Sequence, residues 1–251
     1  MKTICVYNIK GGVGKTTTTI NLSAILAEKG YKVLMVDADP QANLSNTSEN
    51  YNHKDYTIAE LLTKKGMLTN EVIIKTEFDN IDLIPSDIRF SYSEREILLD
   101  MGRKPHDRLK KALEQVKDIY DYCIIDCPPA WNLITTNVLH VSDEVLIPIV
   151  IDRYTLDGVN DLMQKINEIK EEYNANLTVK GCFVTRDEPT TVNKQVKEGL
   201  KEFLGSIFLR TSIRKNVSVP ESTFECKPVI FYKKNSNASK DYYSLARELN
   251  L

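Results

Sequence analysis

The chain has 251 residues, of which 42% are hydrophobic and 27% are charged, and its net charge is −2. These values are typical of a globular protein with a sizeable core, and the near-neutral charge by itself argues against a strongly nucleic-acid-binding protein. There is no run of about 18 apolar residues, and the N-terminus enters a predicted strand directly, so we expect a cytoplasmic protein with no signal peptide and no membrane span.

Short β-branched apolar runs alternate with helical patterns along the chain. In chain order, strands are predicted at 3–7, 33–36, 81–84, 122–125, 144–149 and 177–184. Helices are predicted at 17–29, 57–64, 105–117, 131–140, 156–173, 192–203 and 238–249. Several strands are apolar without alternation, as parallel strands buried on both faces are. The sequence therefore predicts an α/β protein: a single domain over residues 1–251, with a doubly wound, mostly parallel sheet and helices on both faces.

The first predicted strand is followed by a phosphate-binding motif, K-G-G-V-G-K-T-T. Its glycines let the backbone curl until successive N–H groups point at one anion, and the helix that begins there adds the positive end of its dipole. Lys15 offers a charge for the β- and γ-phosphates, and the Thr16 hydroxyl is placed to ligate Mg²⁺. This order of strand, loop and helix predicts a nucleoside triphosphate site. The candidate nucleotide ligands are Lys10, Gly11, Gly12, Val13, Gly14, Lys15, Thr16 and Thr17.

An extra lysine distinguishes this loop from the usual G-x-x-x-x-G-K-[ST] pattern. That pattern requires glycine at position 9, where this chain has Ile9, and Lys10 stands at the entrance of the loop. A lone lysine is most often a solvated surface residue. Beside a triphosphate site, however, a cation can offset the negative charge of the phosphates. We therefore interpret Lys10 as a residue that acts on the nucleotide and sets this chain apart from other nucleotide-binding proteins.

Three aspartates follow predicted strands. Asp37 and Asp39 lie two residues apart at the end of the second strand, so their side chains leave the sheet on the same side. An aspartate there can orient the attacking water or a water bound to Mg²⁺. Asp126 ends the strand at 122–125, as the metal-holding aspartate of a P-loop protein does. The predicted metal ligands are Thr16, Asp39 and Asp126, and the predicted catalytic residues are Lys10, Lys15 and Asp39.

The cysteines and histidines give little support to a metal site of another kind. The five cysteines are scattered without a C-x-x-C pair, and three of them lie in apolar runs, where buried thiols are the simpler interpretation. The three histidines are far apart in the sequence.

Together these motifs resemble those of the ParA/Soj-type partition ATPases, in the MinD/ParA branch of P-loop proteins with a deviant Walker A loop. The resemblance covers most of the chain. Beyond the loop it includes D-A-D-P-Q, I-I-D-C-P-P, P-I-V-I-D-R-Y-T-L-D-G, G-C-F-V-T-R and Y-S-L-A-R-E-L. It implies ATP and Mg²⁺ as cofactors and a weak intrinsic ATPase activity.

The resemblance also implies roles for single residues. In the family, ATP drives a face-to-face dimer in which the lysine at the position of Lys10 reaches the phosphates of the other subunit. Asp39 matches the aspartate that positions the hydrolytic water. Asp37 matches its structural and metal-side neighbour, so the resemblance makes Asp37 a further candidate for cofactor binding. Thr185 and Arg186, with the segment near 212–221, match the adenine contacts.

Further implications of the resemblance are nonspecific DNA binding by the ATP-loaded homodimer, its association with the nucleoid, and a ParB-like protein that stimulates hydrolysis. Basic residues exceed acidic ones after residue 177, which permits such binding. The candidate DNA-binding residues are Lys194, Lys197, Lys201, Arg214 and Lys215. The first three share one helix face, but Glu198 and Glu202 interleave with them, so a solvated face is an equally good interpretation. The family is often basic where this chain has Ser218.

Other functions remain open at this point. A MinD-like membrane ATPase would need a C-terminal amphipathic helix with a basic polar face, whereas this chain ends on a short helix of balanced charge. A metallocluster reductase would need paired cysteines, and Cys127 has no evident partner. An ATPase that positions protein clusters would share these motifs. A nucleotide-dependent regulator with little hydrolysis also shares them, although Asp39 and Lys15 argue against a complete loss of hydrolysis.

Overall fold

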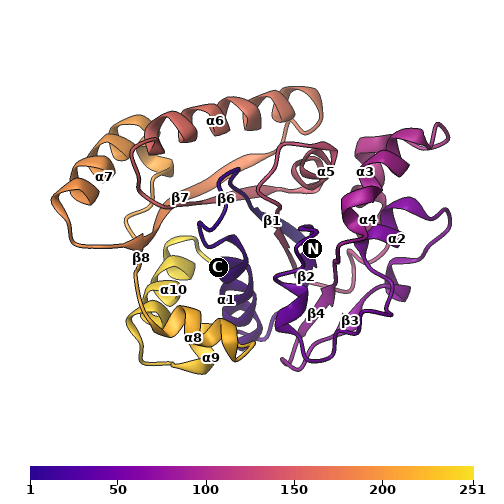
Figure 1. Cartoon of the computed structure of the whole chain (residues 1–251), viewed down its shortest axis with the longest axis horizontal. Helices are drawn as coiled ribbons and strands as arrows, with labels where there is room; N and C mark the ends of the chain where they lie inside the picture. The colour runs from indigo at the N-terminus through magenta and orange to yellow at the C-terminus, as the bar shows by residue number, and fades with distance from the viewer.

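An eight-stranded sheet runs through the molecule, and the computed structural model describes all residues from 1 to 251 (Figure 1). The strand order is β3-β4-β2-β5-β1-β6-β7-β8, and only the β3–β4 pair is antiparallel. This confirms the predicted α/β fold with a mostly parallel sheet. The strands are β1 Lys2–Val6, β2 Val33–Asp37, β3 Ile74–Lys75, β4 Ile81–Ile84, β5 Tyr122–Asp126, β6 Glu144–Ile149, β7 Thr178–Asp187 and β8 Ile213–Arg214.

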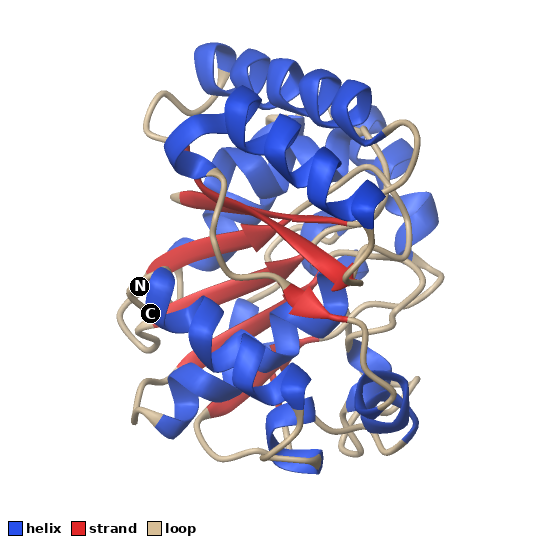
Figure 2. Cartoon of the chain, turned by 90° about the vertical axis from the view of Figure 1, so that its left-hand side faces the viewer, coloured by secondary structure: helices blue, strands red, loops and turns tan.

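Helices cover both faces of this sheet (Figure 2). They are α1 Lys15–Glu28, α2 Ile58–Thr63, α3 Phe90–Leu99, α4 Arg108–Glu114, α5 Leu133–Val141, α6 Thr155–Glu172, α7 Thr191–Leu204, α8 Ser218–Phe224, α9 Val229–Tyr232 and α10 Asn237–Glu248. All seven predicted helices are present, with ends shifted by a few residues.

Alternate residues of the central strands pack into two hydrophobic cores, one on each face of the sheet. On β1, Cys5 packs into the core beneath α2 and α4 to α7, whereas Ile4 and Val6 pack beneath α1, α9 and α10. The side chains of β2 alternate in the same way, and all five of its residues are buried. Burial on both faces explains why these strands read as unbroken apolar runs in the sequence.

Five elements were not predicted from the sequence: β3, β8, α3, α8 and α9. The strands β3 and β8 have two residues each and α9 has four, which is too short for a periodic pattern. Helix α3 buries Phe90 and Ile97 but exposes Tyr92, Leu98 and Leu99, so its apolar residues do not mark one face. Short length and exposed apolar side chains thus account for these omissions.

The carboxyl ends of the parallel strands all lie on one edge of the sheet. In Figure 2 the strand arrows point to the right, so this edge faces the viewer in Figure 1. The loops that carry the predicted site residues after β1, β2, β5 and β7 emerge there, where ligands bind in open α/β sheets. No helix has both the length and the apolarity needed to cross a membrane.

Candidate functional site

The loop between β1 and α1 has the backbone of an anion cradle. Gly12 and Gly14 adopt φ angles of 70° and 89°, which side-chain-bearing residues rarely adopt. Added Cβ atoms at Gly11 and Gly12 would meet nothing within 4 Å, so at Gly12 it is the backbone conformation that requires glycine. Helix α1 then begins with no side-chain cap and no acidic residue in its first turn. Its N-terminal N–H groups are therefore free to bind a phosphate.

Lys15 brings a charge into this cradle. Its side chain is buried, and Nζ donates a hydrogen bond to the Lys10 carbonyl oxygen at 3.1 Å. Burial lowers the pKa of Lys15, while the charges of Asp126 and Asp39 oppose that change. A buried ammonium group with a single carbonyl partner lacks a full set of acceptors, which phosphate oxygens would supply.

Asp126 has a buried carboxylate oxygen that could ligate a cation. Its Oδ2 accepts a hydrogen bond from the Thr16 hydroxyl at 2.6 Å, whereas its buried Oδ1 has no hydrogen-bond partner. Burial and the neighbouring Asp37 raise the pKa of Asp126 well above its usual range. No group of three or more His, Cys, Asp or Glu side chains is arranged to hold a metal ion. The residues therefore fit Mg²⁺ in the form it usually takes beside nucleotides, with few protein ligands and phosphate oxygens completing its shell.

Asp37 holds the loop after β2 in place. It is fully buried beside Asp126 in the β2–β5 register. Its oxygens accept hydrogen bonds from the Ser45 N–H at 2.8 Å, the Ser45 hydroxyl at 2.7 Å and the Asp39 N–H at 3.0 Å. Both oxygens thus have donors from the chain itself, so Asp37 holds the segment 38–45 in shape. The role of Ser45 was missed because it has no motif of its own.

Burial is also the main reason why the pKa of Asp37 rises from 3.8 to about 6, although the hydrogen bonds from Ser45 and Asp39 lower it. The folded chain therefore binds this proton more tightly than the unfolded chain does. The resulting stability is present below pH 4 and is lost as the pH rises through about 6. In metal-free and nucleotide-free protein, we expect the free energy of unfolding to fall as the pH rises across this range.

Urea unfolding followed by the fluorescence of Trp131, the only tryptophan, would measure this change. Asp37→Asn is the control, because it removes one of the two titrating carboxyls; the fall with pH should be smaller than in the wild-type chain, and Asp126, whose pKa is also raised, accounts for the remainder. An equally steep dependence in that variant would assign the effect to another group.

Asp39 is buried at the edge of the phosphate loop, and only one of its two carboxylate oxygens accepts a hydrogen bond from the chain. Its Oδ1 accepts a hydrogen bond from the Gln41 N–H at 2.9 Å, and its charge acts on the pKa of Lys15. The turn closes with a bond from the Ala42 N–H to the Asp39 carbonyl oxygen, and Ala42 takes a φ of 55°. This conformation is strained for alanine, which indicates a loop held in shape by its neighbours.

Lys10 lies at the outer rim of the site. Its side chain is exposed and forms an ion pair with Asp152, which follows β6. This hydrogen bond is the main reason why the pKa of Asp152 is lowered. The pair lines a shallow cavity of about 400 Å³ with Tyr154 and Asp161. Within one chain, then, the Lys10 ammonium group is held by Asp152 outside the cradle, a partner that the sequence analysis did not identify.

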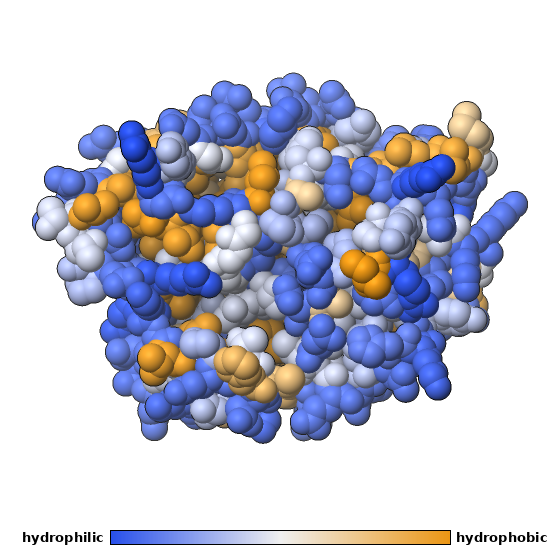
Figure 3. Space-filling view, in the orientation of Figure 1, coloured by the Kyte–Doolittle hydropathy of each residue, from blue (hydrophilic) through white to orange (hydrophobic).

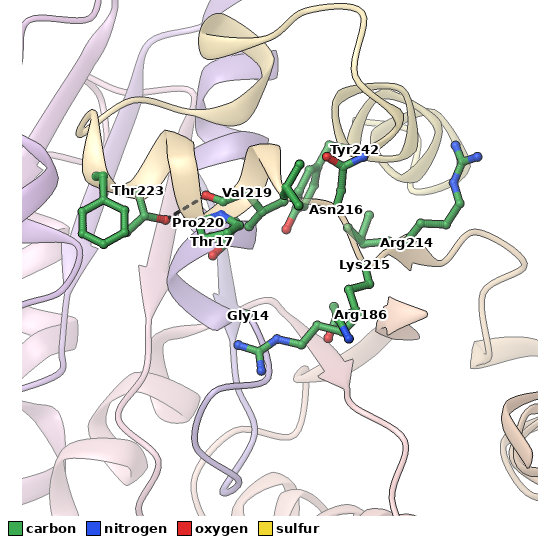
Figure 4. A pocket seen from close by; sticks show the side chains of 14 residues that line it. Gly14, Thr17, Arg186, Arg214, Lys215, Asn216, Val219, Pro220, Thr223 and Tyr242 are labelled. Carbon is green, nitrogen blue, oxygen red and sulfur yellow. Dashed lines mark hydrogen bonds between the residues drawn. The ribbon is translucent and has the colours of Figure 1, made fainter. Parts of the chain in front are cut away.

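A second cavity, of about 470 Å³, adjoins the start of α1 (Figure 4). Its lining includes the predicted residues Thr185 and Arg186 and most of the predicted segment 212–221. In Figure 4 the Arg186 side chain extends toward Gly14, and its backbone has a φ of 52°. The lining also includes three residues that the sequence analysis missed: Thr223, Phe224 and Tyr242. The volume is in the usual range for a ligand pocket, and its place beside the phosphate loop suits a base and ribose.

The five candidate DNA-binding residues differ in the cavity that they line and in their ion pairs. Arg214 and Lys215 line the cavity beside α1, where they bind Asp241 and Glu188. Lys194, Lys197 and Lys201 lie on α7, and only Lys197 has a carboxylate partner, Asp187 at 2.7 Å. Lys197 is the α7 lysine that adjoins the other two, because the carbonyl oxygen of the same Asp187 accepts a hydrogen bond from the Lys215 N–H at 3.0 Å.

The comparisons with known proteins agree with this geometry. The AAA domain family matches residues 1–179. Sporulation initiation inhibitor protein Soj of Bacillus subtilis is 37% identical over 250 residues, covering 99% of this chain and 98% of that protein. Chromosome-partitioning ATPase Soj of Treponema pallidum is 35% identical over 249 residues, covering 99% and 96%.

Among solved structures, cobyrinic acid a,c-diamide synthase from Mycobacterium smegmatis with a bound ATP analogue and magnesium has a TM-score of 0.85 and 26% sequence identity. The match covers 98% of this chain and 93% of that one. The likeness to the two Soj proteins runs over nearly the full length of each. The chain belongs to the ParA/Soj-type family of partition ATPases.

Proposed function

We propose that this chain is a Mg²⁺-dependent ATPase whose ATP-bound form is a homodimer that binds DNA without sequence preference and is reset by hydrolysis. The observation that carries the ATPase part is the buried Asp126 Oδ1 without a partner, beside Thr16 and the uncapped start of α1. Such a site is built for a metal-bound triphosphate. By the resemblance, a ParB-like partner stimulates hydrolysis.

Different residues of the chain bind the phosphates, hold the metal ion and orient the attacking water. The N–H groups of residues 11–16 and the Lys15 ammonium group bind the phosphates and hold the γ-phosphate in line for attack. Thr16 and Asp126 would hold Mg²⁺, which would neutralise charge on the phosphate oxygens. Asp39 orients the attacking water and accepts its proton.

Exposed apolar residues support a dimer through the carboxyl edge of the sheet. Several loops on this edge carry them: Ile9, Ile88, Tyr154, Leu156, Val192 and Val217, with exposed fractions from 38% to 72%. Figure 3 shows several groups of apolar side chains on this face, separated by charged ones. Apolar residues gathered around a nucleotide site favour a face that is covered by another protein surface. A second copy facing the first would cover both nucleotides and bring the Lys10 of each subunit near the site of the other.

Helix α10 gives no support to the membrane-bound alternative. Its apolar residues Tyr242, Leu245 and Ala246 are buried in the core beneath α1. A helix that binds a membrane surface needs that face free. DNA is therefore the better partner for the ATP-bound form.

A salt titration of duplex DNA binding with ATP, with ADP and without nucleotide tests this function. We expect retention with ATP that falls steeply with salt, and at least tenfold weaker binding in the other two states, because only the dimer doubles the number of phosphate contacts. Lys15→Ala, which removes the buried phosphate ligand, is the control and should bind equally weakly with and without ATP. Equal retention in all three states would disprove the switch, and no retention at low salt would disprove DNA binding.

A further inference from the structure

A basic cleft lies on the flank of the molecule, next to the cavity beside α1: Val184 and Ser212 line the cleft, and Thr185 and Ile213 line that cavity. It is formed by α7, the strand β7 and the segment from Gly205 to Ser212, and its volume is about 1090 Å³. Figure 2 faces this flank and shows α7 and the connection that leads from it to β8. Its charged lining residues are Lys180, Lys197, Lys201, Arg210 and Glu248. The cleft thus has a net charge of +3 in a chain whose total is −2.

Packing of α7 fixes two of these cations. The helix starts at the Thr190 cap, whose hydroxyl accepts a hydrogen bond from the Asn193 N–H at 3.1 Å, and it buries Leu200 and Leu204 against the core. Lys197 and Lys201 are four residues apart on this helix, so their side chains lie one turn apart along the same side. Both line the cleft.

The segment after α7 places the third cation, Arg210. Gly205 has a φ of 58° and ends the helix, and the chain then returns along β7 with a bond from the Leu209 N–H to the Cys182 carbonyl oxygen at 2.8 Å. Gly181 makes this approach possible, because a Cβ atom there would lie 2.7 Å from the Leu209 side chain. Glu248 then accepts hydrogen bonds from the N–H groups of Arg210 and Thr211 at 2.8 and 2.9 Å.

The charges in this cleft are poorly compensated. Neither Lys201 nor Arg210 forms an ion pair, and both are exposed. Lys180 must share Glu144 with Lys2. Of the four cations only Lys197 has a carboxylate to itself. Arg214 and Lys215, by contrast, are bound to acidic partners beside the nucleotide cavity.

We propose that this cleft binds the backbone phosphates of DNA, with Lys201 and Arg210 as the main contacts and Lys180 and Lys197 as supporting cations. This inference rests on the proposed DNA-binding function and locates it. Flexible cations in an open groove contact phosphates without reading bases, as nonspecific binding requires. Two of these residues, Lys180 and Arg210, have no signal in the sequence, because only the return of the chain along β7 brings them beside α7.

The test compares two double variants by fluorescence anisotropy with a labelled duplex, in the presence of ATP and Mg²⁺. In Lys201→Ala/Arg210→Ala we expect the slope of log affinity against log salt to decrease by about 2 per subunit, with affinity at least tenfold lower near 0.1 M salt. The matched control, Lys65→Ala/Lys110→Ala, removes two exposed lysines near the other end of the sheet and should keep the wild-type slope. The conservative variant Lys201→Arg/Arg210→Lys should also keep it.

Each outcome of this test either supports or contradicts the assignment of DNA binding to the cleft. Equal loss in both alanine variants would show that only net charge matters and would overturn the cleft assignment. An unchanged slope in Lys201→Ala/Arg210→Ala would overturn it as well. If that variant instead loses binding of inorganic tripolyphosphate, measured by calorimetry in a Lys15→Ala background, but keeps the DNA slope, the cleft binds small anions and the proposal is wrong. Failure of the wild-type chain to bind DNA in any nucleotide state would disprove the proposed function itself.

Discussion

Replacing Lys10 with alanine is expected to abolish partner-stimulated ATP hydrolysis while leaving ATP binding nearly intact. The reason lies in where the side chain is held. Lys15, and not Lys10, is buried in the cradle, and the Lys10 ammonium group is bound by Asp152 at the rim. A cation supplied from the other subunit can offset charge that develops on the phosphates during hydrolysis. In related enzymes such cations contribute roughly 10³-fold or more to the rate.

The measurement is the steady-state rate of phosphate release with DNA and the stimulating partner, next to the affinity for a fluorescent ATP analogue. Loss of rate by roughly 10³-fold with a less than threefold change in affinity would support action across the interface. A comparable loss of affinity would instead place Lys10 in its own subunit's cradle. Stimulated turnover that survives the substitution would remove Lys10 from the mechanism.

Asp152→Asn is the matched variant for this experiment. It should keep the stimulated rate, because it frees Lys10 instead of removing it. Exposed ion pairs contribute only about 0–1 kcal/mol, so the Asp152 contact is weak enough to be exchanged for a phosphate contact in a dimer. If Asp152→Asn lost activity as fully as Lys10→Ala, the ion pair itself would be the functional unit.

The sequence predicted best those parts of the site that depend on local backbone. The phosphate loop needs glycine where φ is positive, and the structure shows such angles at Gly12 and Gly14. Asp37 and Asp126 were predicted because each ends an apolar strand, and the parallel β2–β5 register places them side by side. Strand burial and backbone conformation can therefore be predicted from the types of residue in the sequence.

Contacts between segments that are distant in the sequence could not be predicted from residue type. Thr223, Phe224 and Tyr242 reach the cavity beside α1 from α8 and α10, more than 200 residues after the phosphate loop. The partners of the basic residues were equally hidden. Helical spacing correctly grouped Lys197 with Lys201, but it could not show that Arg214 binds Asp241 or that Arg210 lies near α7. Charge counts along a sequence say which cations exist, and only the fold says which are already paired.

Replacing Asp39 with alanine is expected to give a protein that binds ATP, hydrolyses it at least 100-fold more slowly and accumulates as a dimer. Loss of a group that orients water and accepts its proton typically slows a reaction by about 10²–10⁴-fold. The phosphate ligands of the loop and the Thr16–Asp126 pair remain, so binding should persist. Light scattering with ATP would detect the accumulated dimer, and phosphate release would give the rate.

Asp39→Asn separates the chemistry of this residue from its role in the loop. The Asp39 Oδ1 accepts the Gln41 N–H, and an asparagine oxygen can accept the same hydrogen bond, so the turn should survive. An amide cannot accept a proton from water at neutral pH. If asparagine is as slow as alanine, the carboxylate takes part in hydrolysis. If asparagine restores turnover, Asp39 acts through the shape of the loop, and the hydrolytic water must be positioned by another group.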